Sequence, residues 1–249
     1  MAPGRVAVVL GGSKGIGQAV AAALGATGRS VVVTYHTDRS GALETLAQIE
    51  RHGGTGIARQ ADAGDPESLR ELFDQAMKLG RIDAVVHGPV TALSGGALEI
   101  APADWQQAMA VSAFSFLWSA QAVSDHMAAH GGGSLVALTS AGSTRVVPGY
   151  AAVGVPKAAL EALVKYLAVE LAPRGVRVNA VRAGPLDTAA FRAVFPNADA
   201  KLARLQRATP AAGSLTFGDI ASAVTFLCSD AARMIMGQVL TVDGGLNLI

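Results

Sequence analysis

Residues 5–28, RVAVVLGGSKGIGQAVAAALGATG, decide the fold of this chain. An apolar, β-branched run at 5–10 leads into the glycine loop GGSKGIG at 11–17, and an alanine-rich segment of helical character follows. Glycines permit a sharp strand-to-helix turn and a close approach of the backbone to a pyrophosphate, which the N–H groups and dipole of the helix N-terminus then stabilise. A plain tight turn is the alternative, and the position of the loop between the first strand and the first helix disfavours it. We therefore expect a dinucleotide site that is contacted by Gly11, Ser13, Lys14, Gly15, Ile16 and Gly17.

The same alternation of short apolar runs and longer helical segments continues along the chain. Strands are expected at 5–10, 30–35, 55–60, 83–87, 133–140, 176–183 and 238–243, and helices at 15–27, 41–52, 66–79, 103–130, 153–172 and 217–229. Strands that are apolar on both faces and separated by helices predict an α/β fold. We expect a single Rossmann-type domain, 1–249, with a doubly wound parallel sheet of about seven strands, helices on both faces and the ligand at the carboxyl ends of the strands. The segment 188–216 lacks a strand pattern and is expected to form a substrate lid.

Composition excludes several classes of protein. With 51% hydrophobic and 16% charged residues the chain is not disordered, and a net charge of +1 argues against nucleic acid or a membrane surface as its partner. The single cysteine, Cys228, cannot form an internal disulfide or a thiolate metal site, and no metal is expected. No apolar run approaches the ~20 residues that span a bilayer, and the start MAPGRVAVVLGG does not read as a signal peptide. We expect a soluble, cytoplasmic protein.

The end of the second expected strand, VVVTYHTDRS at 31–40, bears on the choice of cofactor. An NAD-selective site places a carboxylate there for the ribose 2′-hydroxyl. This chain has Tyr35 and His36 instead, with Asp38 further into the turn. Lys14 and Arg39 are expected to neutralise a 2′-phosphate, so the sequence favours NADPH over NADH. The alternative is that Lys14 and Arg39 are ordinary solvated charges.

Several segments together resemble the short-chain dehydrogenase/reductase family over the whole chain. They are GGSKGIG, RQADAGD at 59–65, Ser140, Lys157, RVNAVRAGPLDT at 177–188 and GQVLTVDGG at 237–245. The resemblance implies that Asp62 and Ala63 hold the adenine, and that Leu186 and Thr188 hold the nicotinamide amide next to Gly184. It also implies a homotetramer formed partly through the C-terminal strand. His87, followed by Gly88 and Pro89, ends the fourth strand beneath the cofactor and is expected to wall the adenine–ribose pocket rather than act as a base.

Departures from the ordinary family pattern point to one subgroup. His87-Gly88-Pro89-Val90 stands where ordinary members have Asn-Asn-Ala-Gly, Ser112 where they have the active-site Asn, and Val153 where they have the catalytic Tyr. The stretch GYAAVGVPKAAL at 149–160 places Tyr150 seven residues before Lys157 instead of four. This Tyr-x6-Lys pair resembles the enoyl-acyl-carrier-protein reductases, as do Val86-His87, Ser112, Ser115, Phe116 and Ala183-Gly184-Pro185. The stretch 149–173 and the ordinary glycine loop resemble the NADPH-dependent type III enzymes, although Ser140 and Val146 stand where related enzymes carry a further tyrosine.

The spacing suits conjugate reduction. Hydride goes to the β-carbon of an enoyl thioester and negative charge appears on the thioester oxygen, two carbons away, so the stabilising donor must lie further from the lysine than in a ketone reductase. We expect Lys157 to bind the nicotinamide ribose, Tyr150 to donate to the enolate oxygen, and Ser140 to orient the thioester or Tyr150. Pro156 is expected in the first helical turn, with Tyr150 on the loop just before it. The alternatives are a packing role for Tyr150 and a strand-end cap for Ser140.

The sequence therefore predicts an NADPH-dependent reductase of trans-2-enoyl thioesters, in fatty-acid or specialised acyl assembly. Arg192, Lys201, Arg204 and Arg207 give the lid a basic face that would attract an acyl carrier protein, although a solvated face is the simpler interpretation. Two alternatives remain open: a ketone, quinone or cyclic-enone reductase of the same fold, and a catalytically weak binding protein.

Overall fold

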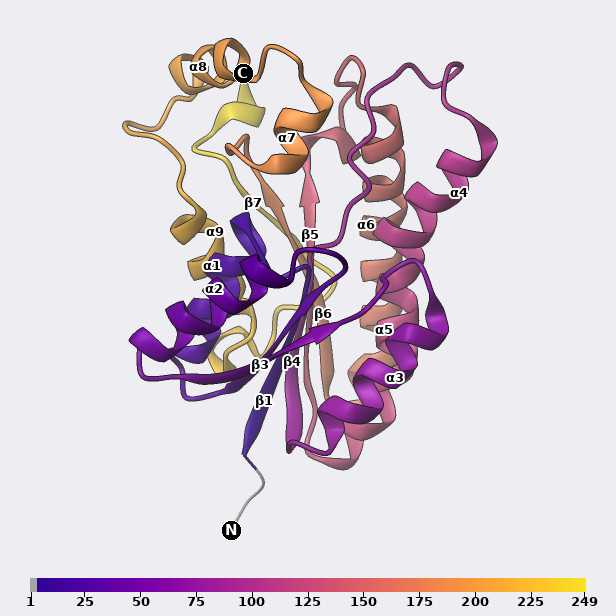
Figure 1. Ribbon diagram of the computed structural model, residues 1–249, viewed down its shortest axis with the longest axis vertical. Helices are drawn as coiled ribbons and strands as arrows, with labels where there is room; N and C mark the ends of the chain where they lie inside the picture. The colour runs from indigo at the N-terminus through magenta and orange to yellow at the C-terminus, as the bar shows by residue number, and fades with distance from the viewer. Residues whose placement is uncertain (1–3) are drawn as a thin grey trace.

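The computed structural model describes residues 4–249, and within them seven parallel strands form one sheet. The strand order is β3-β2-β1-β4-β5-β6-β7 (Figure 1). The strands are β1 (Arg5–Leu10), β2 (Ser30–Tyr35), β3 (Thr55–Gln60), β4 (Arg81–His87), β5 (Gly133–Ser140), β6 (Val176–Ala183) and β7 (Val239–Val242). The predicted doubly wound parallel sheet is confirmed.

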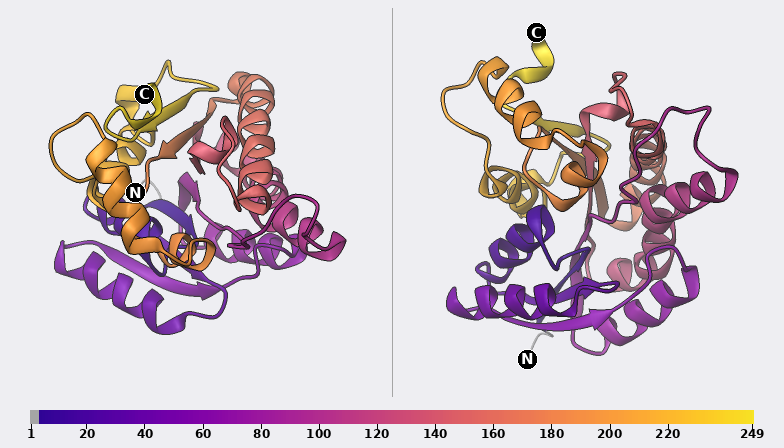
Figure 2. Two further views of the ribbon diagram at one scale, coloured as in Figure 1. Left: turned by 90° about the horizontal axis from the view of Figure 1, so that it is seen from above. Right: turned by 45° about the horizontal axis from the view of Figure 1, so that its top comes forward.

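Helices cover both faces of the sheet (Figures 1 and 2). One face carries α1 (Gly15–Gly25), α2 (Arg39–Arg51) and α9 (Phe217–Leu227), and the other carries α3 (Pro66–Met77), α4 (Pro102–Met109), α5 (Ser115–Ala129) and α6 (Ala151–Leu171). Because the central strands are sandwiched, their residues are apolar on both sides, as β1 illustrates with five consecutive buried residues after Arg5.

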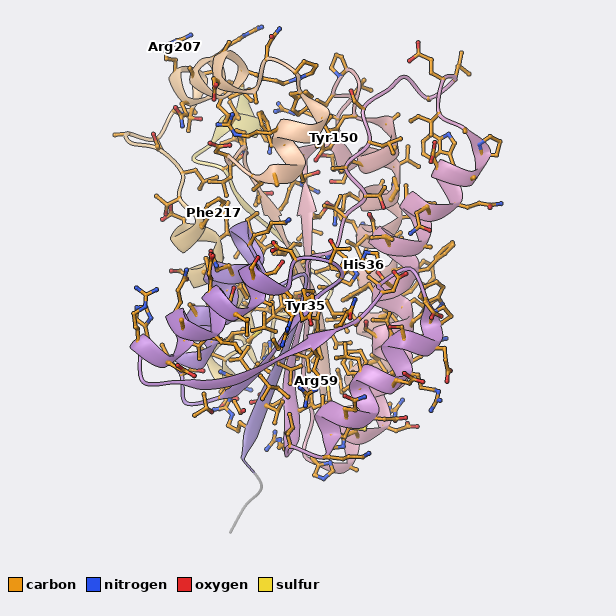
Figure 3. The ribbon with its side chains drawn as sticks, viewed as in Figure 1. Tyr35, His36, Arg59, Tyr150, Arg207 and Phe217 are labelled. Atoms are coloured by element: carbon orange, nitrogen blue, oxygen red, sulfur yellow. The ribbon has the colours of Figure 1, made fainter. Side chains whose placement is uncertain are left out.

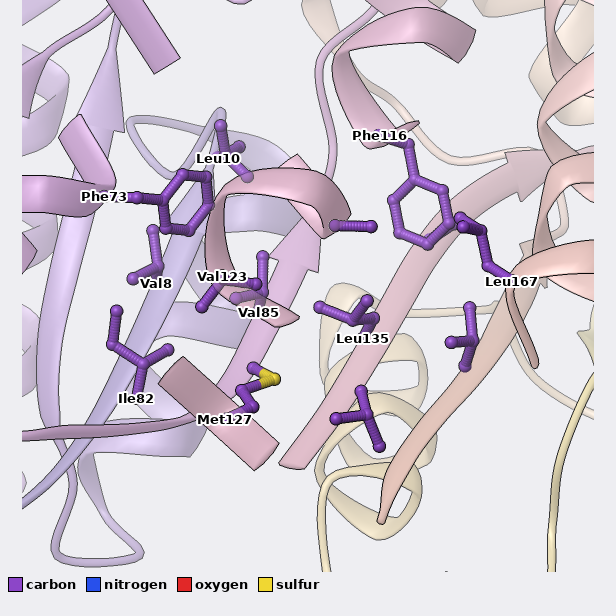
Figure 4. Close-up of a cluster of buried hydrophobic side chains, with 14 of the residues drawn as sticks. Val8, Leu10, Phe73, Ile82, Val85, Phe116, Val123, Met127, Leu135 and Leu167 are labelled. Carbon is purple, nitrogen blue, oxygen red and sulfur yellow. The ribbon is translucent and has the colours of Figure 1, made fainter. Parts of the chain in front are cut away.

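Two hydrophobic cores result from this sandwich. Val8 and Leu10 of β1 belong to one core with Phe73 of α3 and Phe116 of α5. Figure 4 shows Phe73 beside Val8 and Leu10, and Phe116 further along the same core near Leu167. The alternate residues of β1, Ala7 and Val9, pack with α1 and α9 on the other side. At about 25 cal/mol per Å² of buried apolar surface, these cores supply the main driving force for the fold.

The sheet divides at β1 and β4, and this division positions the site. The chain leaves β1 toward β2 and β3 on one side, whereas β4 to β7 lie on the other. Such a switch point opens a crevice at the carboxyl ends of the two strands. Gly88 lies there beside β1, since its N–H donates to the carbonyl of Leu10 at 3.1 Å.

The expected helix at 103–130 is interrupted by a π-turn, Ala110–Phe114, between α4 and α5. The N–H of Ser115 bonds the carbonyl of Ala110, five residues back, and the Ser115 hydroxyl donates to the carbonyl of Val111 at 2.6 Å. Such turns are frequent at functional sites, and this one carries the buried Ser112.

The segment 188–216 contains two short helices, α7 (Ala189–Val194) and α8 (Ala198–Ala208), above the carboxyl ends of the strands (Figure 1). Over residues 4–249, no helix has both the length and the apolar character needed to cross a membrane.

Candidate active site

A cleft of about 840 Å³ lies at the carboxyl ends of the strands. Its walls are the glycine loop, the residues that follow β2 to β6, and the segment that contains α7 and α8. Within the described residues, no group of three His, Cys, Asp or Glu side chains is arranged to hold a metal ion.

The glycine loop is one of the segments that line the cleft. Gly11 and Gly15 adopt left-handed backbone conformations, with φ of 71° and 57°. Gly17 has no room for a side chain, because a Cβ there would lie 2.1 Å from the carbonyl oxygen of Gly11. Lys14 is the N-cap residue of α1, and its side chain accepts no hydrogen bond from the helix. The first N–H groups of the helix are therefore free to bind an anion. All six predicted loop residues line the cleft, and the cradle fits a pyrophosphate.

His36 and Asp62 lie together in the cleft, just after the ends of β2 and β3. Both line the cleft with Ala63, and His36 Nε2 is 3.8 Å from an Asp62 carboxylate oxygen. Figure 3 shows Tyr35 and His36 where β2 ends. The structure therefore brings together the residues that were expected to surround the adenine and its ribose.

The predicted pair of cations is not brought together. Arg39 is the exposed first residue of α2 and lies outside the residues that line the cleft. Lys14 lines the cleft, but its ammonium is 3.3 Å from the carboxylate of Asp38. Asp38 caps α2, and the N–H of Gly41 holds the pKa of its carboxyl below the usual range. The local charge is thus an ion pair rather than two free cations.

The prediction that His87 walls the cofactor pocket is wrong for its side chain. The imidazole is fully buried, its Nε2 lies 2.6 Å from the Ser115 hydroxyl, and its ring packs edge-on against Phe116. Burial, and then the charge of Lys157, hold its pKa well below the ordinary value. Side chains alternate along a strand, and this position faces α5 rather than the cleft. Gly88 and Pro89, which follow His87, do line the cleft.

Tyr150 and Lys157 both reach the cleft from α6. Tyr150 is the N-cap, just before the helix as expected, and Lys157 is the seventh helical residue. Seven residues make two turns, so the side chains lie on one face about 10 Å apart along the axis. Pro156 was expected in the first turn, but it is the sixth residue of the helix. The first turn is instead formed by Ala151 and its successors, which bond back to the carbonyl of Tyr150.

The Lys157 ammonium is buried beneath the cleft. It is 5% exposed, and its Nζ donates to the carbonyls of Leu138 at 2.9 Å and Pro89 at 3.4 Å. Burial lowers its pKa to about 8, and the carboxylate of Glu161 opposes this effect. At neutral pH the lysine is therefore mainly charged.

The Tyr150 hydroxyl donates to Ser140 Oγ at 3.3 Å. Burial raises the pKa of the phenol, and the bond to Ser140 opposes this effect. Tyr150 is therefore a neutral hydrogen-bond donor at physiological pH.

An apolar wall adjoins Tyr150. Its ring stacks on that of Phe195, with centroids 5.8 Å apart and planes 8° from parallel, and the Lys201 ammonium lies 3.5 Å from the centroid of Phe195. Val153 is 2% exposed and packs with Val194 and Phe195. Neither Phe191 of α7 nor Phe195, which follows that helix, was predicted, because no local pattern in the segment 188–216 indicates which side chains face the cleft.

The residues that were expected to hold the nicotinamide amide lie where β6 ends. Gly184, Leu186 and Thr188 line the cleft as predicted. Gly184 must be glycine, since a Cβ there would lie 2.8 Å from the Cα of Asp243. The Thr188 side chain caps α7 by accepting from the N–H of Phe191 at 3.0 Å, so its hydroxyl proton stays free to donate.

Comparisons with known proteins agree with this geometry. A family model described as enoyl-(acyl carrier protein) reductase matches residues 11–247. The chain is 36% identical to the 1-cyclohexenylcarbonyl-CoA reductase of Streptomyces collinus, over 98% of this chain and 88% of that protein. It is 32% identical to the NADH-dependent enoyl-[acyl-carrier-protein] reductase FabI of Nostoc sp., over 99% and 97% of the two chains. A solved structure assigned as a short-chain alcohol dehydrogenase from Sinorhizobium meliloti superposes with a TM-score of 0.91 at 31% identity, covering 100% and 98%.

The chain belongs to the short-chain dehydrogenase/reductase family, in the group that includes the enoyl reductases. It is an oxidoreductase with a fold that binds a nicotinamide cofactor.

Proposed function

We propose that the protein is an NADPH-dependent reductase of the carbon–carbon double bond of trans-2-enoyl thioesters, acting in fatty-acid or specialised acyl assembly. One observation carries the proposal: the phenol of Tyr150 lies two helical turns before Lys157, and the position one turn before Lys157 is the buried, apolar Val153. A hydrogen-bond donor is thus placed away from the lysine, where an enolate oxygen forms during conjugate reduction. The alternative packing role for Tyr150 does not account for its bond to Ser140.

The side chains divide the work. The glycine loop would hold the pyrophosphate, Asp62 and Ala63 the adenine, and Leu186 and Thr188 the nicotinamide amide. When bound, the reduced nicotinamide supplies a hydride to the β-carbon of the substrate. Lys157 binds the ribose and its charge favours the developing anion, while Tyr150 donates a hydrogen bond, and then a proton, to the thioester oxygen. Ser140 orients the Tyr150 hydroxyl.

The wall around Tyr150 suits an apolar acyl group. Phe195, Val153 and the neighbouring side chains Val90, Ala92, Val147 and Phe191 present no charge to it. We propose that α7 and α8, within the segment 188–216, act as a lid that excludes water from this region. The thioester reductases among the relatives support an acyl thioester, and an acyl carrier protein is one candidate carrier.

Not all of the lid arginines are free for such a carrier. Arg192 pairs in bidentate fashion with Asp187 at 2.6 Å and reaches Asp199 at 2.9 Å. Arg204 and Arg207 are exposed on α8, with Lys201 nearer the cleft. The basic face that would receive a carrier protein is therefore smaller than the sequence implied.

Lys14 supports NADPH over NADH. It projects from the glycine loop into the cleft, where its ammonium would transfer from Asp38 to a 2′-phosphate. The relative from Nostoc uses NADH, so paired affinities for the two cofactors test this part of the proposal. The family resemblance also favours a homotetramer, and a monomer by light scattering would contradict it.

The reaction is tested by following NADPH oxidation with a short trans-2-enoyl thioester and, side by side, with a β-ketoacyl thioester. We expect oxidation with the enoyl substrate alone, and a fall of ~10²-fold or more in Tyr150→Phe. Tyr166→Phe is the matched control, because Tyr166 is 72% exposed on the same helix and does not line the cleft. A carbonyl reductase is the second candidate, favoured by the Tyr150–Ser140 pair; activity on the keto substrate that survives Tyr150→Phe would refute the enoyl proposal.

A further inference from the structure

A buried carboxylate lies one helical turn beyond Lys157, and the reaction described above gives it no role. Glu161 is four residues further along α6, so its side chain lies on the same face of the helix as that of Lys157. Both side chains are nearly inaccessible, Glu161 at 8% and Lys157 at 5% exposed. A buried carboxylate is stable only where hydrogen bonds and opposite charge replace its lost hydration. Its partners therefore indicate what it holds in place.

Glu161 accepts hydrogen bonds from two strands and a turn. Thr139 of β5 donates its hydroxyl to Oε1 at 2.8 Å, and Ser143 donates to the same oxygen at 2.5 Å. Arg182 of β6 donates through Nε to Oε1 at 3.2 Å and through Nη2 to Oε2 at 2.6 Å. Glu161 thus ties α6 to the carboxyl ends of β5 and β6, the two strands that border the nicotinamide end of the cleft.

Two of these partners flank Ser140. Thr139 precedes it, and Ser143 ends the 3₁₀ turn Ala141–Ser143 that follows it. Tyr150 packs directly on this turn, since a Cβ on Gly142 would come within 2.6 Å of the tyrosine ring. The contact between Ser143 and Glu161 therefore fixes the surface against which Tyr150 is held.

Glu161 also acts on Lys157 through its charge. The titratable groups whose charges act on the Lys157 ammonium are His87 from β4 and Glu161, with Arg182 of β6 behind Glu161, and Tyr150 reaches the same cleft from the start of α6. His87 is uncharged at neutral pH because its pKa is well below the ordinary value, and Tyr150 is uncharged because its pKa is raised. The Glu161 carboxylate is the group that opposes the loss of the lysine's proton.

We propose that Glu161 is a positioning residue with two tasks: it holds the Ser140–Ser143 turn against Tyr150, and it keeps Lys157 in the charged form that binds the cofactor. Arg182 acts through Glu161 by orienting the carboxylate and partly neutralising it. The proposal rests on the proposed role of Lys157 in cofactor binding, and it does not depend on which double bond is reduced.

The first measurement is the affinity for NADPH as a function of pH, followed by the fluorescence of the cofactor. The affinity of the unmodified protein is expected to fall as Lys157 loses its proton, through a midpoint near its pKa of about 8. Glu161→Gln keeps the shape of the side chain and its acceptor oxygen but removes the charge, so the midpoint moves to lower pH by about one unit. Arg182→Met leaves the carboxylate without its neutralising partner, so the midpoint moves to higher pH. Shifts of the pH midpoint in opposite directions for Glu161→Gln and Arg182→Met distinguish an electrostatic role of Glu161 from general damage to the fold.

Ser143→Ala is the uncharged control for the first task. It removes one donor to Glu161, so the midpoint stays in place while kcat, on whichever substrate the unmodified protein reduces, falls by about tenfold. The charge role would be refuted if the pH midpoint of NADPH affinity were the same in Glu161→Gln as in the unmodified protein. It would also be refuted if Glu161→Gln and Arg182→Met moved this midpoint in the same direction. Unchanged kcat in Ser143→Ala would refute the positioning role.

The design keeps the proposal separate from the enzymatic one. The affinity titration needs no substrate, so a protein that reduces a ketone instead of an enoyl thioester leaves this readout intact. Should Arg182→Met fail to fold, the comparison of Glu161→Gln with Ser143→Ala still decides both tasks.

Discussion

Replacing Lys157 by methionine is expected to abolish activity and, at neutral pH, to relieve a large destabilisation. Methionine has a similar length and fills the buried site without a charge. Burying the ammonium is unfavourable, as the fall of its pKa from 10.5 to about 8 indicates. Burial of this charge is therefore unfavourable for the fold, as expected if Lys157 has the proposed role in cofactor binding.

The size of the effect follows from that pKa. At 1.36 kcal/mol per pKa unit, the difference between 10.5 and about 8 corresponds to roughly 3 kcal/mol. Between pH 8 and pH 10.5 the unfolded chain binds the proton that the folded chain has lost, so the free energy of unfolding rises with pH across this window. Above pH 10.5 the lysine is neutral in both states and the penalty is absent; below pH 8 the penalty is fully present.

The assay is urea unfolding without cofactor, at fixed protein concentration, at pH values from 7 to 11. The difference in unfolding free energy between the unmodified chain and Lys157→Met should change by about 3 kcal/mol across this range, since groups common to both chains cancel. The lost bonds to the carbonyls of Leu138 and Pro89 offset the difference by a constant amount. Lys78→Met, at an exposed position, should give no such change. If the difference in unfolding free energy between the unmodified chain and Lys157→Met did not change with pH, the reasoning would be refuted, because burial would then not lower the pKa of Lys157.

Three further variants test the cleft. Asp38→Asn should strengthen NADPH binding by about tenfold and leave NADH unchanged, because it frees Lys14 and removes a negative charge beside the 2′-phosphate; equal effects on both dissociation constants would contradict the assignment. Phe195→Ala should raise KM for the acyl substrate and lower kcat several-fold, because it removes the ring stacked on Tyr150; steady-state kinetics with an unaltered cofactor affinity checks this. Gly17→Ala should lower cofactor affinity more than tenfold and the melting temperature by several degrees, because its Cβ would lie 2.1 Å from a backbone oxygen; unaltered binding by calorimetry would count against the cradle.

The sheet and the glycine loop were predictable because both rest on local pattern. Strands that are apolar on both faces have few alternatives to a parallel sheet with helices on each side, and all seven expected runs are strands within a few residues of the predicted bounds. The loop residues were predictable for a related reason. The turn needs glycine at position 17, because the backbone of the same loop leaves no room there for a side chain, and this requirement is visible in the sequence.

The misplaced residues depend on tertiary context. Whether His87 faces the cleft or α5 is decided by the register of the last strand residue, and a shift of one residue reverses it. The start of α6 was misjudged because a proline in the sixth helical position is rare. The role of Glu161 rests on Ser143 and Arg182, which lie 18 and 21 residues away in sequence, and no local pattern links them.

The shifted tyrosine and the lid are parts of one arrangement. With tyrosine moved to position 150, position 153 is free to be apolar, and Val153 packs against the same Phe195 on which Tyr150 stacks. Phe195, in the segment proposed as the lid, therefore contacts both Tyr150 and Val153, and the Lys201 ammonium lies 3.5 Å from the centroid of the Phe195 ring. A tyrosine at position 153 would have to displace Val194 and Phe195, because Val153 borders the cleft but is packed against both and only 2% exposed. The phenol of Tyr150, the proposed donor, is thus held by packing between α6 and the segment 188–216 as well as by its spacing from Lys157.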